Sequence, residues 1–440
     1  MTAPAPHDLT WRDWLFLAMV AVLPLHTLFI EAWISWKPFL IAVAVLAVGD
    51  LVDGMRARSW PWHRRVSLAL LAFAVAVLIG WPQGVYLERF LRLGLALVVG
   101  GLVLLVTERR LRSPGMLDRT LGVVFWSAAA MGVTALVFEL VLVGAFGAPL
   151  IETVNDVPGF YRVFKPAYLE EGFLALTNWH QDPGYNAAWS VLWAVLAFMA
   201  VFRGRGSGRW WLDGMVIGGL GFASIMAFSR TGWVSFPLAV AVAAAMVVQR
   251  WRVPIREVAV RLAVAVVTTV VLVAGVWAVD APDEGGDLSL QFAFRASQGW
   301  DLLATATGWF GSSEDFSDRF AVSEERADVW PEYWAFFLED PVTGVGLGVG
   351  WLTTSISQEP HNLFLELAGE TGLLGLIGFG LVLGTVLVAG GGIVGGVALF
   401  AAFLHSVTQT VLFEPTWWFA AGIYLAGVAA LGAREPMTDR

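Results

Sequence analysis

Five side chains able to handle a phosphate or a hydroxyl group stand beside long apolar runs in this 440-residue sequence. Arg89 and Arg92 precede one run, and Arg230 separates two runs within Ser-Arg-Thr-Gly-Trp. Arg326 and His361 precede a later run, the histidine within Glu-Pro-His-Asn. A guanidinium offers planar paired donors that match phosphate oxygens, and a neutral imidazole accepts a proton near pH 7. These residue types predict binding of an anionic group and general-base chemistry.

Ordinary structural roles compete with these interpretations. Arg89 and Arg92 can extend to water beside Glu88, because long basic side chains bury their aliphatic part and keep the charged group solvated. Arg326 has three acidic neighbours in the sequence, and an isolated histidine is more often structural than catalytic. Arg230 is different, because no acidic residue stands next to it in a tight connection. It is therefore the strongest candidate for an anionic ligand.

The composition places these residues in a membrane protein. Hydrophobic residues make up 58% of the chain and charged residues 14%, whereas a soluble domain has about 25% charged residues. The 23 tryptophans suit the membrane–water interface. A soluble enzyme, a nucleic-acid-binding protein and a disordered protein are excluded. The absence of cysteine excludes disulfides, thiolate metal sites and cysteine nucleophiles.

Long apolar runs predict an all-α polytopic fold with about 12 transmembrane helices. A helix needs about 20 residues, at about 1.5 Å each, to cross about 30 Å of hydrocarbon. The expected spans are Trp14–Ile34, Phe39–Leu51, Val66–Trp81, Phe90–Val106, Leu117–Phe146, Asn186–Phe202, Leu212–Phe228, Thr231–Val248, Val258–Val279, Leu373–Ala389, Ile393–Leu412 and Trp417–Leu431.

Arginine clusters set the expected orientation. They occupy residues 56–65, 109–119, 203–209 and 250–261, which are alternate connections between the expected spans. The positive-inside rule places these connections and both termini in the cytoplasm. No cleavable signal peptide is evident. The five candidate residues then lie on the opposite, outward face.

Two outward segments interrupt the spans. Residues 1–279 form the expected first bundle, with an outward segment near 147–185. Residues 280–370 form an acidic, helical, outward-facing loop domain before span ten that ends in the His-Asn motif, and residues 371–440 form the last three spans and a cytoplasmic tail.

Glycines surround the histidine in two patterns. Pro-Val-Thr-Gly-Val-Gly-Leu-Gly-Val-Gly, residues 341–350, lacks the Gly-Lys-Ser/Thr ending of a P-loop. We expect an extended segment whose backbone approaches another element closely. Gly369, Gly372 and Gly375 have helical spacing and predict a smooth stripe for close helix contact.

The ordered set of Ser-Arg-Thr-Gly-Trp, Arg326 before Pro-Val-Thr-Gly-Val-Gly-Leu-Gly, and His-Asn-x-x-Leu-x-x-x-Gly-x-x-Gly resembles the O-antigen ligase and O-antigen polymerase superfamily of bacterial envelopes. The resemblance covers roughly residues 178–380. It implies a multi-pass protein of the bacterial inner (plasma) membrane that transfers a glycan from undecaprenyl diphosphate to a sugar hydroxyl on the periplasmic face. The implied partners are this lipid-linked donor, a lipid A-core or other sugar acceptor, and membrane lipids, without nucleic acid.

Family roles transfer to matching positions only. The resemblance implies diphosphate binding by Arg230 and Arg326, and action of His361 on the acceptor hydroxyl. Arg89 and Arg92 correspond more loosely to cavity-lining residues. Three polar residues at the end of the first outward segment and the start of span six have roles that the sequence does not specify: His180, Asp182 and Asn186.

The chemistry fits this resemblance. Breaking the anomeric carbon–oxygen bond leaves negative charge on the diphosphate, which arginines stabilise. The sequence has no Asp-x-Asp, so we expect a metal-independent, inverting reaction without a cofactor. We favour O-antigen ligation to lipid A-core. The alternatives are a polymerase of the same superfamily and a membrane transporter, for which ionisable residues at mid-membrane would be typical.

Overall fold

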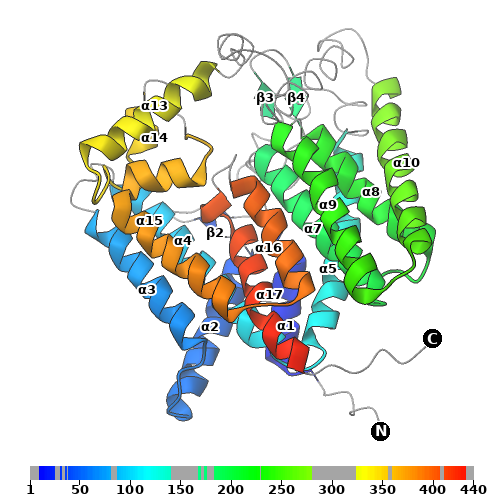
Figure 1. Ribbon diagram of the computed structural model, residues 1–440, viewed down its shortest axis with the longest axis horizontal. Helices are drawn as coiled ribbons and strands as arrows, with labels where there is room; N and C mark the ends of the chain where they lie inside the picture. Colours follow the sequence, from blue (N-terminus) through cyan, green and yellow to red (C-terminus); the bar gives the residue numbers. More distant parts are fainter. Residues whose placement is uncertain are drawn as a thin grey trace.

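The computed structural model describes residues 9–24, 30–31, 35–36, 38–80, 87–139, 167–169, 173–175, 183–227, 229–279, 324–354, 359–406 and 411–432. These residues are mostly helical, and Figure 1 shows the helices side by side in one bundle. Two short antiparallel strand pairs, β1–β2 and β3–β4, accompany the helices. The helical part of the predicted fold class is confirmed.

Each of the twelve expected spans contains a helix over at least part of its length. The first expected span, Trp14–Ile34, is wrong at its end, because α1 ends at Val22 and Ile30 begins strand β1. The elements are α1 (Trp11–Val22), β1 (Ile30–Glu31), β2 (Ser35–Trp36), α2 (Pro38–Arg56), α3 (Arg64–Ile79), α4 (Leu87–Leu111), α5 (Met116–Val137), β3 (Ala167–Leu169), β4 (Phe173–Ala175), α7 (Pro183–Phe202), α8 (Trp210–Met226), α9 (Arg230–Trp251), α10 (Ile255–Val279), α13 (Glu324–Glu339), α14 (Gly350–Thr353), α15 (Leu363–Ala389), α16 (Ile393–Ser406), η4 (Val411–Phe413) and α17 (Pro415–Gly432).

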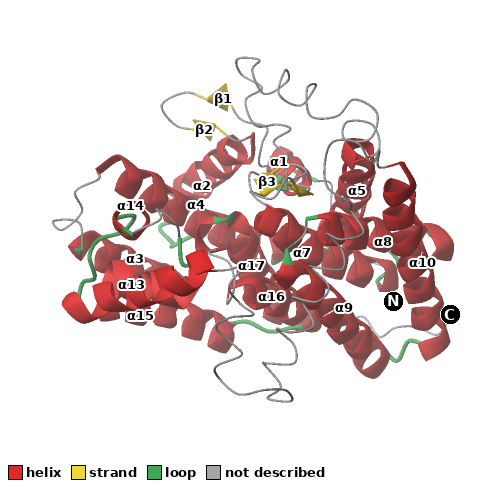
Figure 2. Ribbon diagram, turned by 90° about the horizontal axis from the view of Figure 1, so that it is seen from above, coloured by secondary structure: helices red, strands yellow, loops and turns green. Residues whose placement is uncertain are grey.

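The core of the bundle is formed around α7. This helix is apolar on all sides, which is typical of a helix with protein on every face, and it packs against α5, α8, α9 and α16 (Figure 2). Trp189 and Trp193 are fully buried, with ring centroids 4.8 Å apart, and Phe419 of α17 lies 5.6 Å from Trp193. Tight aromatic packing therefore joins α7, the sixth expected span, to α17, the last.

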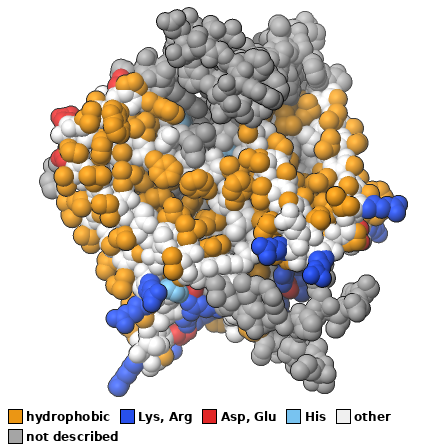
Figure 3. All heavy atoms as spheres, in the orientation of Figure 1, with side chains coloured by type: hydrophobic (Ala, Val, Ile, Leu, Met, Phe, Trp, Pro, Cys, Tyr) orange, Lys and Arg blue, Asp and Glu red, His pale blue; other side chains and the backbone are white. Residues whose placement is uncertain are grey.

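Six described helices are long and apolar enough to cross a membrane: residues 89–111 of α4, 116–137 of α5, 185–202 of α7, 231–251 of α9, 255–276 of α10 and 363–389 of α15. Figure 3 shows a broad hydrophobic surface, with Lys and Arg side chains gathered along its lower edge. The protein is therefore a polytopic membrane protein. The count of twelve spans stays a prediction, because α8 and α16 are apolar but shorter.

We name the two ends of the bundle by their residues. The basic end holds the connections at residues 57–63, 112–115, 203–209 and 252–254, which contain or adjoin the arginine clusters. The histidine end is the opposite one, where α4, α9 and α15 begin and where α13 lies (Figure 1). All five candidate residues belong to elements of the histidine end.

Two expectations about α15 are wrong. The helix begins at Leu363, ten residues before the expected start of span ten, because Asn362 caps it there. The glycines of α15 do not form one smooth stripe, because Gly372 has non-helical backbone angles (φ 60°, ψ −159°) that break the helix. The break divides α15 into the turns before Gly372 and the longer part after it.

Candidate functional site

His361 stands immediately before α15 in a constrained backbone conformation. Its φ of 48° is left-handed, which is uncommon for a residue other than glycine. Asn362 follows as the N-cap, and its Oδ1 accepts hydrogen bonds from the backbone N–H groups of Phe364 and Leu365, both at 3.1 Å. The cap fixes where the helix starts and therefore where the imidazole is attached.

Helix α13 is attached to the segment that carries the histidine. Trp330 Nε1 donates to the carbonyl oxygen of Pro360 at 2.8 Å. One turn later Tyr333 is fully buried and lies against Gly350 and Gly369, where an added Cβ would come within 2.6 and 2.9 Å of its atoms. Burial raises the pKa of Tyr333 above its usual range. Glycine at both positions therefore lets a large ring sit behind the start of α15.

The break in α15 is filled by residues 341–346. Leu373 N and Leu374 N donate to the carbonyl oxygens of residues 341 and 342 at 2.9 and 3.1 Å. In the other direction, Val345 N and Gly346 N donate to the carbonyl oxygens of residues 369 and 370 at 3.0 and 2.9 Å. The backbone groups that the break frees are thus paired by the glycine segment, as buried peptide groups require.

The glycine segment, residues 341–350, is a series of turns and not the extended segment expected from its alternation. Gly344, Gly346 and Gly348 have φ values of 67°, 108° and 81°, which glycine adopts without strain. The expected close backbone approach is confirmed, because a Cβ on Gly344 would lie 2.4 Å from the carbonyl carbon of Glu370.

The carboxylate of Glu370 accepts hydrogen bonds from the glycine segment. Its side chain is 1% exposed. Gly348 N donates to Glu370 Oε2 at 2.7 Å, and Gly350 N donates to Oε1 at 3.1 Å. These two N–H groups are therefore satisfied within the protein. The sequence analysis missed Glu370. A charged residue directly before an apolar run was the feature that could have indicated a role for it.

Arg89 contacts both the histidine segment and the glycine segment. Its guanidinium forms an ion pair with Glu359 at 2.9 Å, two residues before His361. A Cβ on Gly348 would lie 2.8 Å from Arg89 Cγ, so the arginine stem packs on the glycine segment. Arg92, one turn further along α4, is exposed. The structure thus brings Arg89 close to the histidine segment and leaves Arg92 at the edge.

The last turn of α16 connects the helices that begin with Arg230 and after His361. His405 Nε2 and Ser235 Oγ are 2.8 Å apart, and both side chains are buried. Phe403 packs against Phe364 with ring centroids 6.1 Å apart. Ser235 lies five residues after Arg230, and Phe364 lies three residues after His361, so α9 and α15 begin at a similar level.

Some predicted site residues are described only in part. Arg230 is the first residue of α9, after the N-cap Ser229, and Arg326 lies in the first turn of α13, one turn before Trp330. The side chains of these two arginines lie outside the described residues, as do His180 and Asp182. Asn186 is buried in α7 and its Nδ2 donates to the carbonyl oxygen of Ala223 at 3.3 Å.

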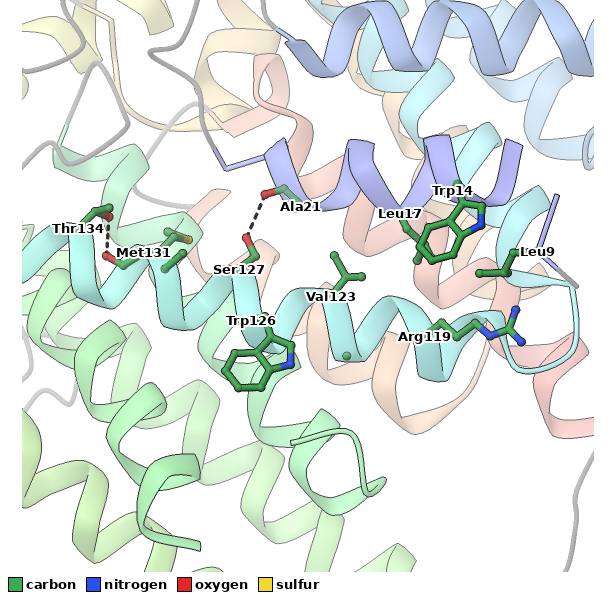
Figure 4. A pocket seen from close by; sticks show the side chains of 12 residues that line it. Leu9, Trp14, Leu17, Ala21, Arg119, Val123, Trp126, Ser127, Met131 and Thr134 are labelled. Atoms are coloured by element: carbon green, nitrogen blue, oxygen red, sulfur yellow. Dashed lines mark hydrogen bonds between the residues drawn. The ribbon is translucent and has the colours of Figure 1, made fainter. Parts of the chain in front are cut away.

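An apolar groove lies elsewhere in the bundle. It has a volume of about 760 Å³ and runs between α1 and α5, with Trp14 and Trp126 on its walls and Arg119 towards the basic end (Figure 4). Ser127 Oγ, within the groove, donates to the carbonyl oxygen of Ala21 at 3.2 Å. None of the five candidate residues lines this groove.

The site therefore combines two helix N-termini, an ion-paired arginine and a histidine at one end of a membrane bundle. Helix N-termini favour anions through their dipoles. Two further arginines belong to the elements that converge there. This arrangement suits an anionic head group at the membrane boundary.

Part of the chain matches a known protein family. Residues 214–380 match a protein-family model described as O-Antigen ligase. The matched part runs from α8 to α15 and contains Arg230, Arg326, the glycine segment and His361. A comparison with curated proteins gave no match. The family match confirms the resemblance that the motifs indicated, because residues 214–380 are similar to the O-antigen ligase family.

Proposed function

We propose that this membrane protein transfers a glycan from undecaprenyl diphosphate to a sugar hydroxyl, with lipid A-core as the acceptor. The family supports glycosyltransferase activity of the O-antigen ligase or polymerase type. The proposal adds the donor, the acceptor and the orientation: twelve spans in the bacterial inner membrane, both termini in the cytoplasm and the histidine end in the periplasm. The arginine clusters at the basic end support this orientation through the positive-inside rule.

The observation that carries the proposal is the double contact of α16. Its last turn touches Ser235 of α9 and Phe364 of α15, so the helix that begins with Arg230 and the helix that follows His361 are tied together near their starts. A diphosphate ligand and a base must lie within one site for transfer to occur. The contact of α13 with Pro360 adds the element that contains Arg326.

In the proposed reaction, His361 accepts the proton of the acceptor hydroxyl as that oxygen attacks the anomeric carbon. The new carbon–oxygen bond forms as the bond to the diphosphate breaks, and the bonding electron pair leaves on the diphosphate. Arg230 and Arg326 stabilise the negative charge that develops there. Arg89 and Arg92 line the donor side. Attack from the face opposite the leaving group inverts the anomeric centre, and no metal or cofactor is needed.

The test is glycan transfer in membranes that contain lipid-linked donor and acceptor. His361→Asn removes the base, and asparagine tolerates the left-handed backbone of this position. We expect a loss of about 10²-fold or more, the usual contribution of a general base. Arg230→Lys keeps the charge but loses the paired donors and should also lower transfer.

The matched control for the arginine is Arg64→Lys, an exposed arginine at the basic end, which should leave transfer unchanged. Transfer at the wild-type rate by stably inserted His361→Asn protein would remove the histidine from the mechanism. The product identifies the acceptor class. A completed chain on lipid A-core indicates a ligase, a ladder of repeat units indicates a polymerase, and flux without a glycosidic product indicates a transporter.

A further inference from the structure

Glu370 contacts the glycine segment in a way that no neutral side chain of the same shape reproduces. Its two carboxylate oxygens each accept a different backbone N–H, from Gly348 and Gly350. A glutamine has one acceptor oxygen, and its NH₂ group would face a second N–H donor. The geometry therefore requires the carboxylate itself and not only a polar group.

The same contact reaches the candidate donor side. Gly348 lies between Glu370, which accepts from its N–H, and Arg89, whose Cγ would be 2.8 Å from a Cβ placed on that glycine. Arg89 in turn is ion-paired to Glu359 beside His361. A chain of direct contacts thus runs from the break in α15, through the glycine segment, to the arginine and back to the histidine segment.

We propose that Glu370 is a positioning residue, which fixes Gly348 and Gly350 and thereby holds Arg89 at the donor side of the site. Glu370 does not touch substrate in this account, because its oxygens are occupied by backbone donors and its side chain is buried. The role rests on the proposed function, since it is for the diphosphate donor that Arg89 is positioned.

The first experiment measures the glycine segment without any activity assay. The chain has no cysteine, so Val349→Cys introduces a single thiol at a position that is 7% exposed. We expect slow labelling by a membrane-impermeant maleimide in intact cells, and at least tenfold faster labelling when Glu370→Gln is added. Glu108→Gln is the matched control, because Glu108 is 1% exposed but belongs to the basic end. Equal labelling in all three proteins would overturn the contact's role in fixing the segment.

The second experiment separates positioning from general stability through the kinetic constants. Glu370→Gln should raise KM for the lipid-linked donor by about tenfold to a hundredfold, the range for one displaced charge-assisted hydrogen bond. KM for the acceptor should stay near the wild-type value. Gly348→Ala should raise donor KM in the same way, because its Cβ displaces Arg89.

A double variant completes the test. Because both changes act through Arg89, Glu370→Gln combined with Gly348→Ala should be little worse than either alone. Additive losses, or equal increases in donor and acceptor KM, would overturn positioning through Arg89. Full transfer by His361→Asn would instead overturn the proposed function, and the labelling result would still decide whether Glu370 fixes the glycine segment.

Discussion

Buried carboxylates at the two ends of the bundle are held by different means. At the basic end Asp50, which is fully buried, pairs with Arg109 at 3.1 Å and with Arg110. Glu108, 1% exposed, pairs with Arg112. At the histidine end Glu370 is as buried, but it is held by two backbone N–H groups. Ion pairs thus hold Asp50 and Glu108, and backbone geometry holds Glu370.

This difference predicts that the two groups of carboxylates affect different properties of the protein. A buried carboxylate between two arginines joins helices and becomes costly to break, because each charge left alone would be buried. A carboxylate held by a glycine segment fixes a local shape instead, and glycine allows that shape. Substitutions at the basic end should therefore change the free energy of unfolding most. Substitutions at the histidine end should change transfer.

Asp50→Ala should have the largest effect on stability. It leaves Arg109 and Arg110 without their shared acid, and breaking a buried ion pair costs about 3–5 kcal/mol. Thermal unfolding of detergent-solubilised protein measures the loss. Asp53→Ala is the control, because the pair of Asp53 with Arg12 is partly exposed and should contribute about 0–1 kcal/mol. An Asp50 variant that unfolds at the wild-type temperature would show that these ion pairs do not stabilise the bundle.

Gly372→Ala should come next. A Cβ there would lie 2.5 Å from the carbonyl of Val342, and the backbone angles of Gly372 (φ 60°, ψ −159°) cost a residue with a Cβ about 1–3 kcal/mol even without a clash. Unfolding temperature reports the change. Gly380→Ala, in the same helix with no atom within 4 Å, should raise stability by about 0.5–1 kcal/mol. Similar destabilisation by both would mean that the break in α15 is not required.

Ser235→Ala tests the contact between α9 and α16. Hydrogen bonds between membrane helices contribute about 0.6 kcal/mol on average and about 1.7 kcal/mol at most, and we expect a loss in this range. Ser406→Ala is the control, since its hydroxyl bonds to the carbonyl oxygen of Ala402 within its own helix. A raised donor KM in the Ser235 variant alone would show that the contact also places the start of α9.

Arg89→Gln should have the smallest effect on stability and a clear effect on transfer. Its ion pair with Glu359 is about a quarter exposed on each side, so it contributes about 0–1 kcal/mol. Arg12→Gln removes a pair of comparable exposure at the basic end and should leave transfer unchanged. The rate of glycan transfer and the unfolding temperature are measured for both variants. Equal transfer by the two would argue against a donor-side role for Arg89.

Hydropathy predicted the helices well because membrane spans depend on composition over many residues. It placed the start of span ten at Leu373, whereas α15 begins at Leu363. Glu366 and Glu370 lie in the missed part and are buried, and the sequence does not show that the carboxylate of Glu370 has backbone N–H partners. The break at Gly372 was missed for the same reason, since glycine fits both a helix and a left-handed turn.

The candidate site was predicted unevenly. The motifs placed His361 before an apolar run, and α15 begins two residues after it, behind the N-cap Asn362. They did not show that Arg89 and Glu359 meet, because 270 residues separate the two in the chain. Nor did they show that α16 joins α9 to α15 through His405 and Phe403. Contacts of this kind arise from packing between distant helices, which one sequence does not encode in a readable pattern.

The burial of α7 has a consequence for the path of a lipid chain. Other helices surround α7, and its apolar side chains are buried, so no polyprenyl tail runs along it. Helix α10 is the opposite case, because Val266, Val267 and Val270 are each more than half exposed. Among the described helices, α10 therefore offers a hydrocarbon chain an open apolar surface that α7 denies it.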